Sequence, residues 1–294
     1  FLKLFSFVDV KYFWSVGNWH DIPETIVANN QEVRAFMYSW SDYAQCYLYP
    51  FNYTVQDDVF MWGSIEEKYM IHKSLHENMF TIGCLFSNNF IETNKDKVFD
   101  ILELNQNKPV VVFYDSPINN TTRFPQSLFD QFRQIILFVE RKYPNIQIVL
   151  KPKRVTNEYR EYFHDSSVKL FDENDIYLGD IINIATLNIG MGIVAPITIS
   201  LIMNKPGIFF DTAGNYDSPF AKYEGELVFR DQESLLNNID QRLTGQFSPI
   251  TIDELKSYLK LEKKSYLDYK SQRWLYLWGS KIMKFLGLEI GGKR

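Results

Sequence analysis

The feature that most constrains the fold is a regular alternation of short apolar runs with amphipathic stretches, from about residue 108 to residue 243. The runs are rich in Val, Ile and Phe, as buried strands are, and the stretches between them space their apolar residues as one face of a helix does. The expected strands are 109–117, 146–153, 168–171, 187–192, 206–214 and 226–231. The expected helices are 125–142, 158–164, 177–185, one from about 194, and 232–243. This pattern predicts an α/β fold with one complete, doubly wound, Rossmann-like domain.

The rest of the chain extends this pattern on both sides. Strands are expected at 33–40, 57–63 and 79–86 and a helix at 65–73, which predicts part of another α/β domain. After residue 250, Lys, Glu, Tyr and Trp recur at helical spacing and predict one or two long helices. The expected division is a partial N-terminal α/β domain (1–95), a Rossmann-like domain (96–248) and C-terminal helices that pack across both (249–294). Because the chain begins with Phe, we expect the natural protein to extend further upstream.

Composition and charge argue against several classes of protein. The formal net charge is -5 and the pI is about 5.5, so we expect no nucleic-acid partner, which would require a broad basic surface. Cys46 and Cys84 predict neither a disulfide framework nor a zinc site, and they fit a reducing cytosol. His72 and His76 are four residues apart but lack the Glu of an H-E-x-x-H motif, so no metal is expected. No apolar run reaches the roughly 18 residues needed to span a bilayer.

Candidate binding residues follow from the positions of the expected strands. In open α/β sheets, ligands bind beyond the carboxyl ends of the strands, so the residues that end each apolar run are the ones to consider. A lysine at such an end can neutralise a diphosphate, although surface lysines are usually only solvated. The candidate substrate-binding residues are Asp115, Ser116, Lys151, Lys153, Gly190, Gly192, Pro196, Thr198, Ser200 and Asp211.

The most informative of these segments is the junction GMGIVAPITIS, where a strand with glycines leads into an apolar helix. Gly190 and Gly192 would let the backbone approach a ligand, the helix would offer N–H groups to a phosphate, and Thr198 and Ser200 would add hydroxyl donors. The alternative is that the glycines only make a tight turn and the hydroxyls cap the helix or face solvent. The junction matches neither a complete G-x-G-x-x-G pattern nor a P-loop.

Acid–base chemistry would have to come from carboxylates, because the sequence has no G-x-S-x-G nucleophile elbow. Asp42 follows the expected strand 33–40 and is the candidate catalytic residue. Asp21 and Glu24 are further candidates. Each of the three has the alternative of being an ordinary loop carboxylate.

Several of these segments, in this order, resemble a known family of enzymes. DDVFMWGSIEEKYM, MFTIGCLFSNNF, PVVVFYDSP, IVLKPKR, LNIGMGIVAPITISLIMNKPGIFFD and ELVFRDQESL are similar to bacterial surface-polysaccharide glycosyltransferases of the GT-B architecture. Kdo-transferase-like and CDP-glycerol-transferase-like enzymes are included in that group. The resemblance covers about residues 55 to 245 and rests on order and spacing more than on a diagnostic motif.

The resemblance implies a donor nucleotide on the C-terminal domain and an acceptor on the N-terminal domain, with VAPITIS as the phosphate loop. IVLKPK resembles the strand where relatives often have Lys-x-His-Pro, but Lys153 stands where the histidine is expected. This departure argues against a cytidine-type donor and implies either a different donor or a weakened activity. The predicted reaction is metal-independent transfer of a sugar from a nucleotide-sugar to a glycan or lipid-linked acceptor. No cofactor is expected beyond the donor itself. The alternatives are transfer of a polyol phosphate and a noncatalytic Rossmann-like binding domain.

The C-terminal segment 272–294 carries a broad apolar stripe, with Arg273, Lys281 and Lys284 beside it. We expect this stripe to pack across the domains, and contact with an anionic membrane is the alternative. The expected location of the protein is the cytoplasm, or the inner face of the membrane if the second interpretation holds.

Overall fold

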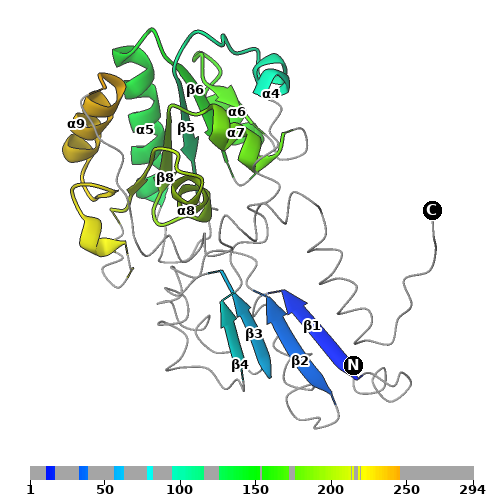
Figure 1. Cartoon of the computed structure of the whole chain (residues 1–294). Helices are drawn as coiled ribbons and strands as arrows, with labels where there is room; N and C mark the ends of the chain where they lie inside the picture. The colour runs from blue at the N-terminus through cyan, green and yellow to red at the C-terminus, as the bar shows by residue number, and fades with distance from the viewer. Residues whose placement is uncertain are drawn as a thin grey trace. The chain divides into compact units, whose positions relative to one another are not determined.

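In the computed structural model of the protein, the chain forms two compact units (Figure 1). One unit comprises Phe1–Asn88 and Asp253–Arg294, and the other comprises Asn89–Ile252. The residues that the structure describes are 11–16, 33–38, 56–62, 78–81, 95–115, 126–152, 154–171, 176–212, 214, 218 and 220–245. The helix expected at 65–73 and all segments expected after residue 250 lie outside these ranges. In the described ranges, no helix is long and apolar enough to cross a membrane.

The second unit is built on a six-stranded parallel sheet, ordered β10-β9-β8-β5-β6-β7. Figure 1 labels its strands β5, β6 and β8. Relative to the order of the strands along the chain, this is the 3-2-1-4-5-6 arrangement of Rossmann folds, so the predicted doubly wound domain is confirmed. The strands are β5 (Val110–Tyr114), β6 (Gln147–Lys151), β7 (Lys169–Leu170), β8 (Leu187–Met191), β9 (Gly207–Phe210) and β10 (Val228–Phe229).

Helices connect these strands, as the apolar periodicity of the sequence predicts. They are α4 (Lys95–Ile101), α5 (Gln126–Lys142), α6 (Asn157–Tyr162), α7 (Leu178–Ile184), α8 (Ala195–Ile202) and α9 (Gln232–Leu243), with a short 3-10 helix, η3 (Ala221–Tyr223), before β10. In α5, the four apolar residues that mark the predicted helical face are all buried; these are Phe129, Phe132, Ile136 and Val139. Burial of each such side chain contributes roughly 2 to 3 kcal/mol to the hydrophobic driving force.

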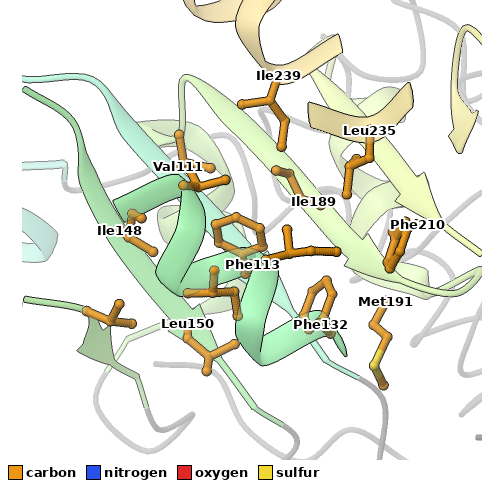
Figure 2. Packing of buried hydrophobic residues seen from close by; sticks show 14 of the residues in the cluster. Val111, Phe113, Phe132, Ile148, Leu150, Ile189, Met191, Phe210, Leu235 and Ile239 are labelled. Atoms are coloured by element: carbon orange, nitrogen blue, oxygen red, sulfur yellow. The ribbon is translucent and has the colours of Figure 1, made fainter. Parts of the chain in front are cut away.

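The main core of the second unit lies between one face of the sheet and helices α5, α6 and α9 (Figure 2). Phe113 of β5 meets Phe132 of α5 edge to face, with 5.7 Å between ring centroids, and Phe132 stacks on Phe210 of β9. Leu235 and Ile239 of α9 pack into the same cluster. The strands β5, β8 and β9 are buried on both faces, which explains why their sequences are continuous apolar runs without alternation.

The first unit contains a four-stranded parallel sheet, ordered β1-β2-β3-β4. The strands are β1 (Tyr12–Val16), β2 (Arg34–Tyr38), β3 (Asp58–Met61) and β4 (Asn78–Thr81). Aromatic rings from all four strands stack on one face: Trp14 is in register with Phe36 and Phe60 with Phe80, and Phe36 and Phe60 are offset by two residues, which keeps them on the same face. The stacked rings are Trp14, Phe36, Phe60 and Phe80.

The structure differs from the predicted elements in a few places. Strand β1 and helix α4 have no counterpart among the predicted elements. Helix α4 buries one residue, Val98, so its sequence has no apolar stripe that would indicate a helix. The run 206–214 is longer than β9, because the chain leaves the sheet after Phe210. The expected strand 79–86 overlaps β4, and its remainder lies outside the described residues.

Candidate functional site

The candidate site lies where the chain reverses the direction in which it adds strands to the six-stranded sheet. From β5 the chain adds β6 and β7 on one side, and it then returns to place β8 on the other side of β5. In doubly wound sheets, this reversal is the switch point beside which ligands bind, at the carboxyl ends of the strands. Asp115 follows β5 and Gly192 follows β8, so these two residues flank this switch point.

Charged residues end several strands at the same edge of this sheet. Lys151 is the last residue of β6, Asp211 follows β9 and Arg230 follows β10. Since all six strands are parallel, these residues share the carboxyl edge with Asp115. Lys151 and Asp211 are buried, with 6% and 0% of their surface exposed. The structure thus brings together three of the predicted charged residues and adds Arg230, which was not among them.

The first glycine of the junction is explained by packing. A Cβ atom on Gly190 would lie 2.4 Å from Cγ2 of Val194 and 2.6 Å from Cγ1 of Ile197, so only glycine lets α8 approach β8 this closely. Gly207 on β9 is under the same helix, where a Cβ atom would lie 3.1 Å from Cγ2 of Ile197. The space that the missing side chain of Gly190 leaves is therefore filled by α8, which favours the structural interpretation of this glycine.

The second glycine makes the turn between β8 and α8. Gly192 has a φ of 69°, in the left-handed region that favours glycine, and its N–H donates to the carbonyl of Phe210 at 2.6 Å. Pro196 carries no N–H, and the N–H of Ile197 donates to the carbonyl of Val194 at 3.1 Å. The N–H groups between these two hydrogen bonds, at residues 193–195, are the ones that lie nearest the strand end.

The two hydroxyl residues of α8 lie inside the protein. Thr198 and Ser200 both have 0% of their surface exposed, and the Ser200 hydroxyl donates to the carbonyl of Pro196 at 2.7 Å. This is the back-bonding that serine commonly makes within a helix. Because its proton is used in this way, we leave Ser200 out of the ligand shell that we propose below.

Asp211 is held in an ion pair at the outer part of the edge. Nη1 of Arg230 lies 3.2 Å from Oδ2 of Asp211, and Nε of Arg230 donates to Oε2 of Glu224 at 2.8 Å. The Asp211 and Arg230 side chains are 0% and 12% exposed, so their charges are largely compensated within the protein. The rule that points to Asp115 and Lys151 also points to Arg230, because it directly follows the apolar residues of ELVFRD.

Asp115 has a different partner. The hydroxyl of the buried Tyr159, on α6, donates to Oδ2 of Asp115. Burial, followed by the negative charge of Asp115, raises the pKa of Tyr159 far above its ordinary value, so the phenol stays neutral and keeps its proton. Asp115 therefore receives a hydrogen bond from Tyr159 without losing its charge.

A buried arginine supports this tyrosine. The guanidinium of Arg133, on α5, lies 4.7 Å from the centre of the Tyr159 ring and 5.1 Å from that of Tyr162. Its Nη1 donates to Oε1 of Glu158 at 2.7 Å. Neither Arg133 nor Tyr159 was predicted, because both lie on helices and reach the strand end only through the packing of α5 against α6.

Some candidates cannot be placed. Asp42, Ser116 and Lys153 lie outside the described residues, as do Asp21 and Glu24. Within the described ranges, no group of three or more His, Cys, Asp or Glu side chains could hold a metal ion.

The fold and the polar groups at its switch point define a class: α/β proteins with a GT-B-like, Rossmann-type ligand-binding domain. The chain belongs to the polysaccharide biosynthesis PFTS motif protein family, whose model matches residues 16–239. Among curated proteins, none matches this chain in sequence.

Solved structures with a similar fold support this classification. UDP-GlcNAc 2-epimerase from Neisseria meningitidis, bound to UDP-GlcNAc, aligns with a TM-score of 0.61 at 13% identity, over 81% of this chain and 70% of that one. The S. aureus MnaA structure with UDP aligns at 0.58 and 12%, over 90% and 77% of the two chains. Sucrose-phosphate synthase from Thermosynechococcus elongatus aligns at 0.54 and 13%, over 95% and 77%. The predicted GT-B-like fold is confirmed, and the family confirms the predicted connection with polysaccharide biosynthesis.

Proposed function

We propose that this protein transfers a sugar from a nucleotide-activated donor to a growing glycan or a lipid-linked acceptor, and that the nucleotide binds at the switch point between β5 and β8. The observation that carries this proposal is the meeting of Asp115, the N–H groups after Gly192 and the cation Lys151 at one edge of a 3-2-1-4-5-6 sheet. This edge is where doubly wound sheets bind nucleotides. The family description supports the part that concerns polysaccharide synthesis.

The chemistry follows from the charges at this edge. When an acceptor hydroxyl attacks the anomeric carbon, its proton passes to a carboxylate base, the bond to the nucleotide phosphate breaks, and negative charge grows on the leaving group. The N–H groups of residues 193–195 and the ammonium of Lys151 stabilise that charge. The proposal requires neither a metal nor a cofactor besides the donor. The acceptor side of the reaction is assigned to the domain within residues 1–95, with Asp42 as the proposed catalytic residue.

A uridine nucleotide is the first donor to test. Two solved proteins with a similar fold were obtained with UDP-GlcNAc and with UDP. Lys153, in place of the histidine of a Lys-x-His-Pro element, argues in the same direction, against a cytidine nucleotide. Transfer of a polyol phosphate predicts instead that a cytidine diphosphate donor binds best.

The test is a thermal-shift screen of the purified chain with UDP, CDP, GDP and CMP, followed by calorimetric titration. We expect the largest stabilisation from UDP. Replacement of Lys151 with Ala should weaken nucleotide binding by about 1 to 3 kcal/mol, because a charge-assisted hydrogen bond is lost.

A matched control is Lys108→Ala, which removes an exposed lysine at the amino end of β5 and should leave the affinity unchanged. If no nucleotide stabilises the protein, the proposal is wrong. If Lys151→Ala and Lys108→Ala bind nucleotide equally well, Lys151 has no part in the site.

A further inference from the structure

Three side chains from three elements contact one another in a row that ends at the switch point. Arg133 of α5 stacks on the ring of Tyr159 of α6, and the Tyr159 hydroxyl donates to Asp115 at the end of β5. We call these three side chains the Asp115 relay. It contains a buried cation, a buried neutral phenol and a carboxylate, in that order.

The burial of Arg133 is costly and calls for an explanation. Only 4% of its surface is exposed, and its Nε and Nη2 atoms have no hydrogen-bond partner within the described part of the chain. Among the described residues, its ion-pair partner is Glu158, whose side chain is 58% exposed, so this pair contributes little to stability. An apolar residue of similar volume would usually be as stable or more so at such a position. The arginine therefore has a use other than stability.

Its position over Tyr159 indicates what that use is. A cation over an aromatic ring is attracted to the ring face, so Arg133 fixes the plane of the phenol from one side. The positive charge also draws electron density from the ring and makes the hydroxyl a stronger donor toward Asp115. Arg133 and Tyr159 therefore fix the orientation of the Asp115 carboxylate.

The two carboxylates of the carboxyl edge differ in this respect. Asp211 is paired with Arg230, and its charge is compensated within the protein. Asp115 accepts a hydrogen bond from Tyr159, a neutral phenol, which orients the carboxylate without bringing a positive charge to it.

We propose that Arg133 and Tyr159 are positioning residues, which hold the Asp115 carboxylate so that it accepts a hydrogen bond from a hydroxyl group of the sugar nucleotide. This inference rests on the proposed function and assigns Asp115 the role of recognising hydroxyls, while the cations of the edge face the phosphates. Fixed orientation matters because a ligand contact loses much of its value when its protein partner must first be ordered.

A double-mutant cycle tests the relay. Tyr159→Phe removes only the hydroxyl and keeps the ring under Arg133, and Asp115→Asn removes the charge of the acceptor. Each variant, and the two combined, is titrated calorimetrically with UDP, CDP, GDP and UDP-GlcNAc. Each single change should weaken the binding of whichever nucleotides the wild-type protein binds by on the order of tenfold, as expected for one hydrogen bond to a charged group. The double variant should be about as weak as Asp115→Asn alone, because Tyr159 acts only through Asp115.

The control is Tyr114→Phe. Tyr114 is also buried at the end of β5, and its hydroxyl donates to Oδ1 of Asn188 at 2.8 Å, so this variant loses a comparable buried hydrogen bond away from Asp115. We expect it to lower thermal stability about as much as Tyr159→Phe while leaving nucleotide affinity unchanged. Arg133→Met should weaken binding and Arg133→Lys should restore part of the loss, because lysine keeps the charge over the ring.

The outcomes separate the inference from the function on which it rests. If the wild-type protein binds none of the nucleotides, the proposed function fails and the relay fails with it. If the wild-type protein binds a nucleotide but Tyr159→Phe binds it as well as Tyr114→Phe does, the function stands and the relay is wrong. A double variant whose loss is the product of the two single losses, about a hundredfold, would also overturn the relay.

Discussion

The two parallel sheets of this protein place polar and charged groups at opposite ends of their strands. In the four-stranded sheet, Asp58, Arg34 and Asn78 are the first residues of β3, β2 and β4, so they lie at the amino ends of the strands. In the six-stranded sheet, the charged residues Asp115, Lys151, Asp211 and Arg230 end the strands or follow them. Ligands bind at the carboxyl ends of such sheets, so position alone separates the two sets.

The bonding of the two sets differs as well. Asp58 accepts hydrogen bonds from Nε and Nη2 of Arg34 at 2.6 and 2.9 Å and from Asn78 at 2.8 Å, which satisfies the carboxylate within its own sheet. Asp115 takes one of its bonds from a neutral phenol and keeps its charge. Asp58 thus meets its partners within its own sheet, whereas Asp115 lies at the end of a sheet where ligands bind, so position and partners together separate a structural carboxylate from a candidate functional one.

The largest effect that would test this comparison is expected under α8. The described strands of the four-stranded sheet contain no glycine, whereas β8 and β9 contain Gly190 and Gly207. Gly190→Ala forces a Cβ atom into Val194 and Ile197 and should lower the free energy of unfolding by about 3 kcal/mol. It should also weaken nucleotide binding, because α8 must move. Urea denaturation and calorimetry measure the two effects.

Gly245→Ala is the matched control for that substitution. Gly245 has a φ of 75° and nothing within 4 Å of an added Cβ atom, so its replacement costs only backbone strain, about 1 kcal/mol. Equal losses of stability in the two variants would show that close packing does not explain Gly190.

A smaller effect is expected at the amino ends of the four-stranded sheet. Asp58→Ala removes the shared acceptor of Arg34 and Asn78 and should destabilise the protein by about 2 kcal/mol, as measured by chemical denaturation. Nucleotide affinity, measured by titration, should not change. Weaker nucleotide binding in a variant that is still folded would contradict the structural role of Asp58, because the groups at the amino ends would then take part in function.

The smallest expected effect is the loss of stability on replacing Asp231, a carboxylate of the carboxyl edge that has a structural role. Asp231, next to Arg230, caps α9: its side chain accepts hydrogen bonds from the N–H and the hydroxyl of Ser234 at 2.8 and 2.7 Å. These bonds lower its pKa, so the carboxylate stabilises the fold above the unfolded pKa of about 3.9, and the gain is lost as pH falls through the lower folded value. Asp231→Ala should cost about 1 kcal/mol at neutral pH.

That cost should shrink as pH falls through the lowered folded pKa of Asp231, because the wild-type carboxyl then becomes protonated too. Asp231→Asn keeps a capping oxygen without a charge that titrates, so its stability relative to Asp231→Ala should not vary with pH. Urea denaturation at several pH values follows these differences. A gap between wild type and Asp231→Ala that persists unchanged in acid would contradict the role of the charge.

Much of the fold could be predicted from the sequence. A doubly wound sheet is buried on both faces, so its strands have uninterrupted apolar sequences. β5, β6, β8 and β9 all fall inside predicted runs. α4 could not be predicted, since a helix with Val98 as its one buried residue has no apolar stripe. The assignment of residues 1–95 and 249–294 to separate domains stays a prediction.

The site was predictable only where it depends on strand ends. That rule finds Asp115, Lys151 and Asp211, and it reaches Arg230 when it is applied to the last strand as well. Tyr159 and Arg133 come to the edge through the packing of two helices, which leaves no local pattern in the sequence. A glycine such as Gly190 is equally ambiguous, because close helix packing and close approach of a ligand both require the absence of a side chain.

The pairing of β5 with β8 has a consequence for how the domain forms. Tyr114 and Asn188, which are joined by a hydrogen bond across these strands, are 74 residues apart in the sequence. Closing so long a loop costs entropy before any contact repays it, and parallel pairings between distant segments form slowly. We therefore expect the switch point to be among the last parts of the domain to assemble during folding. A nucleotide that binds there recognises the completed domain, so its binding also reports that folding has finished.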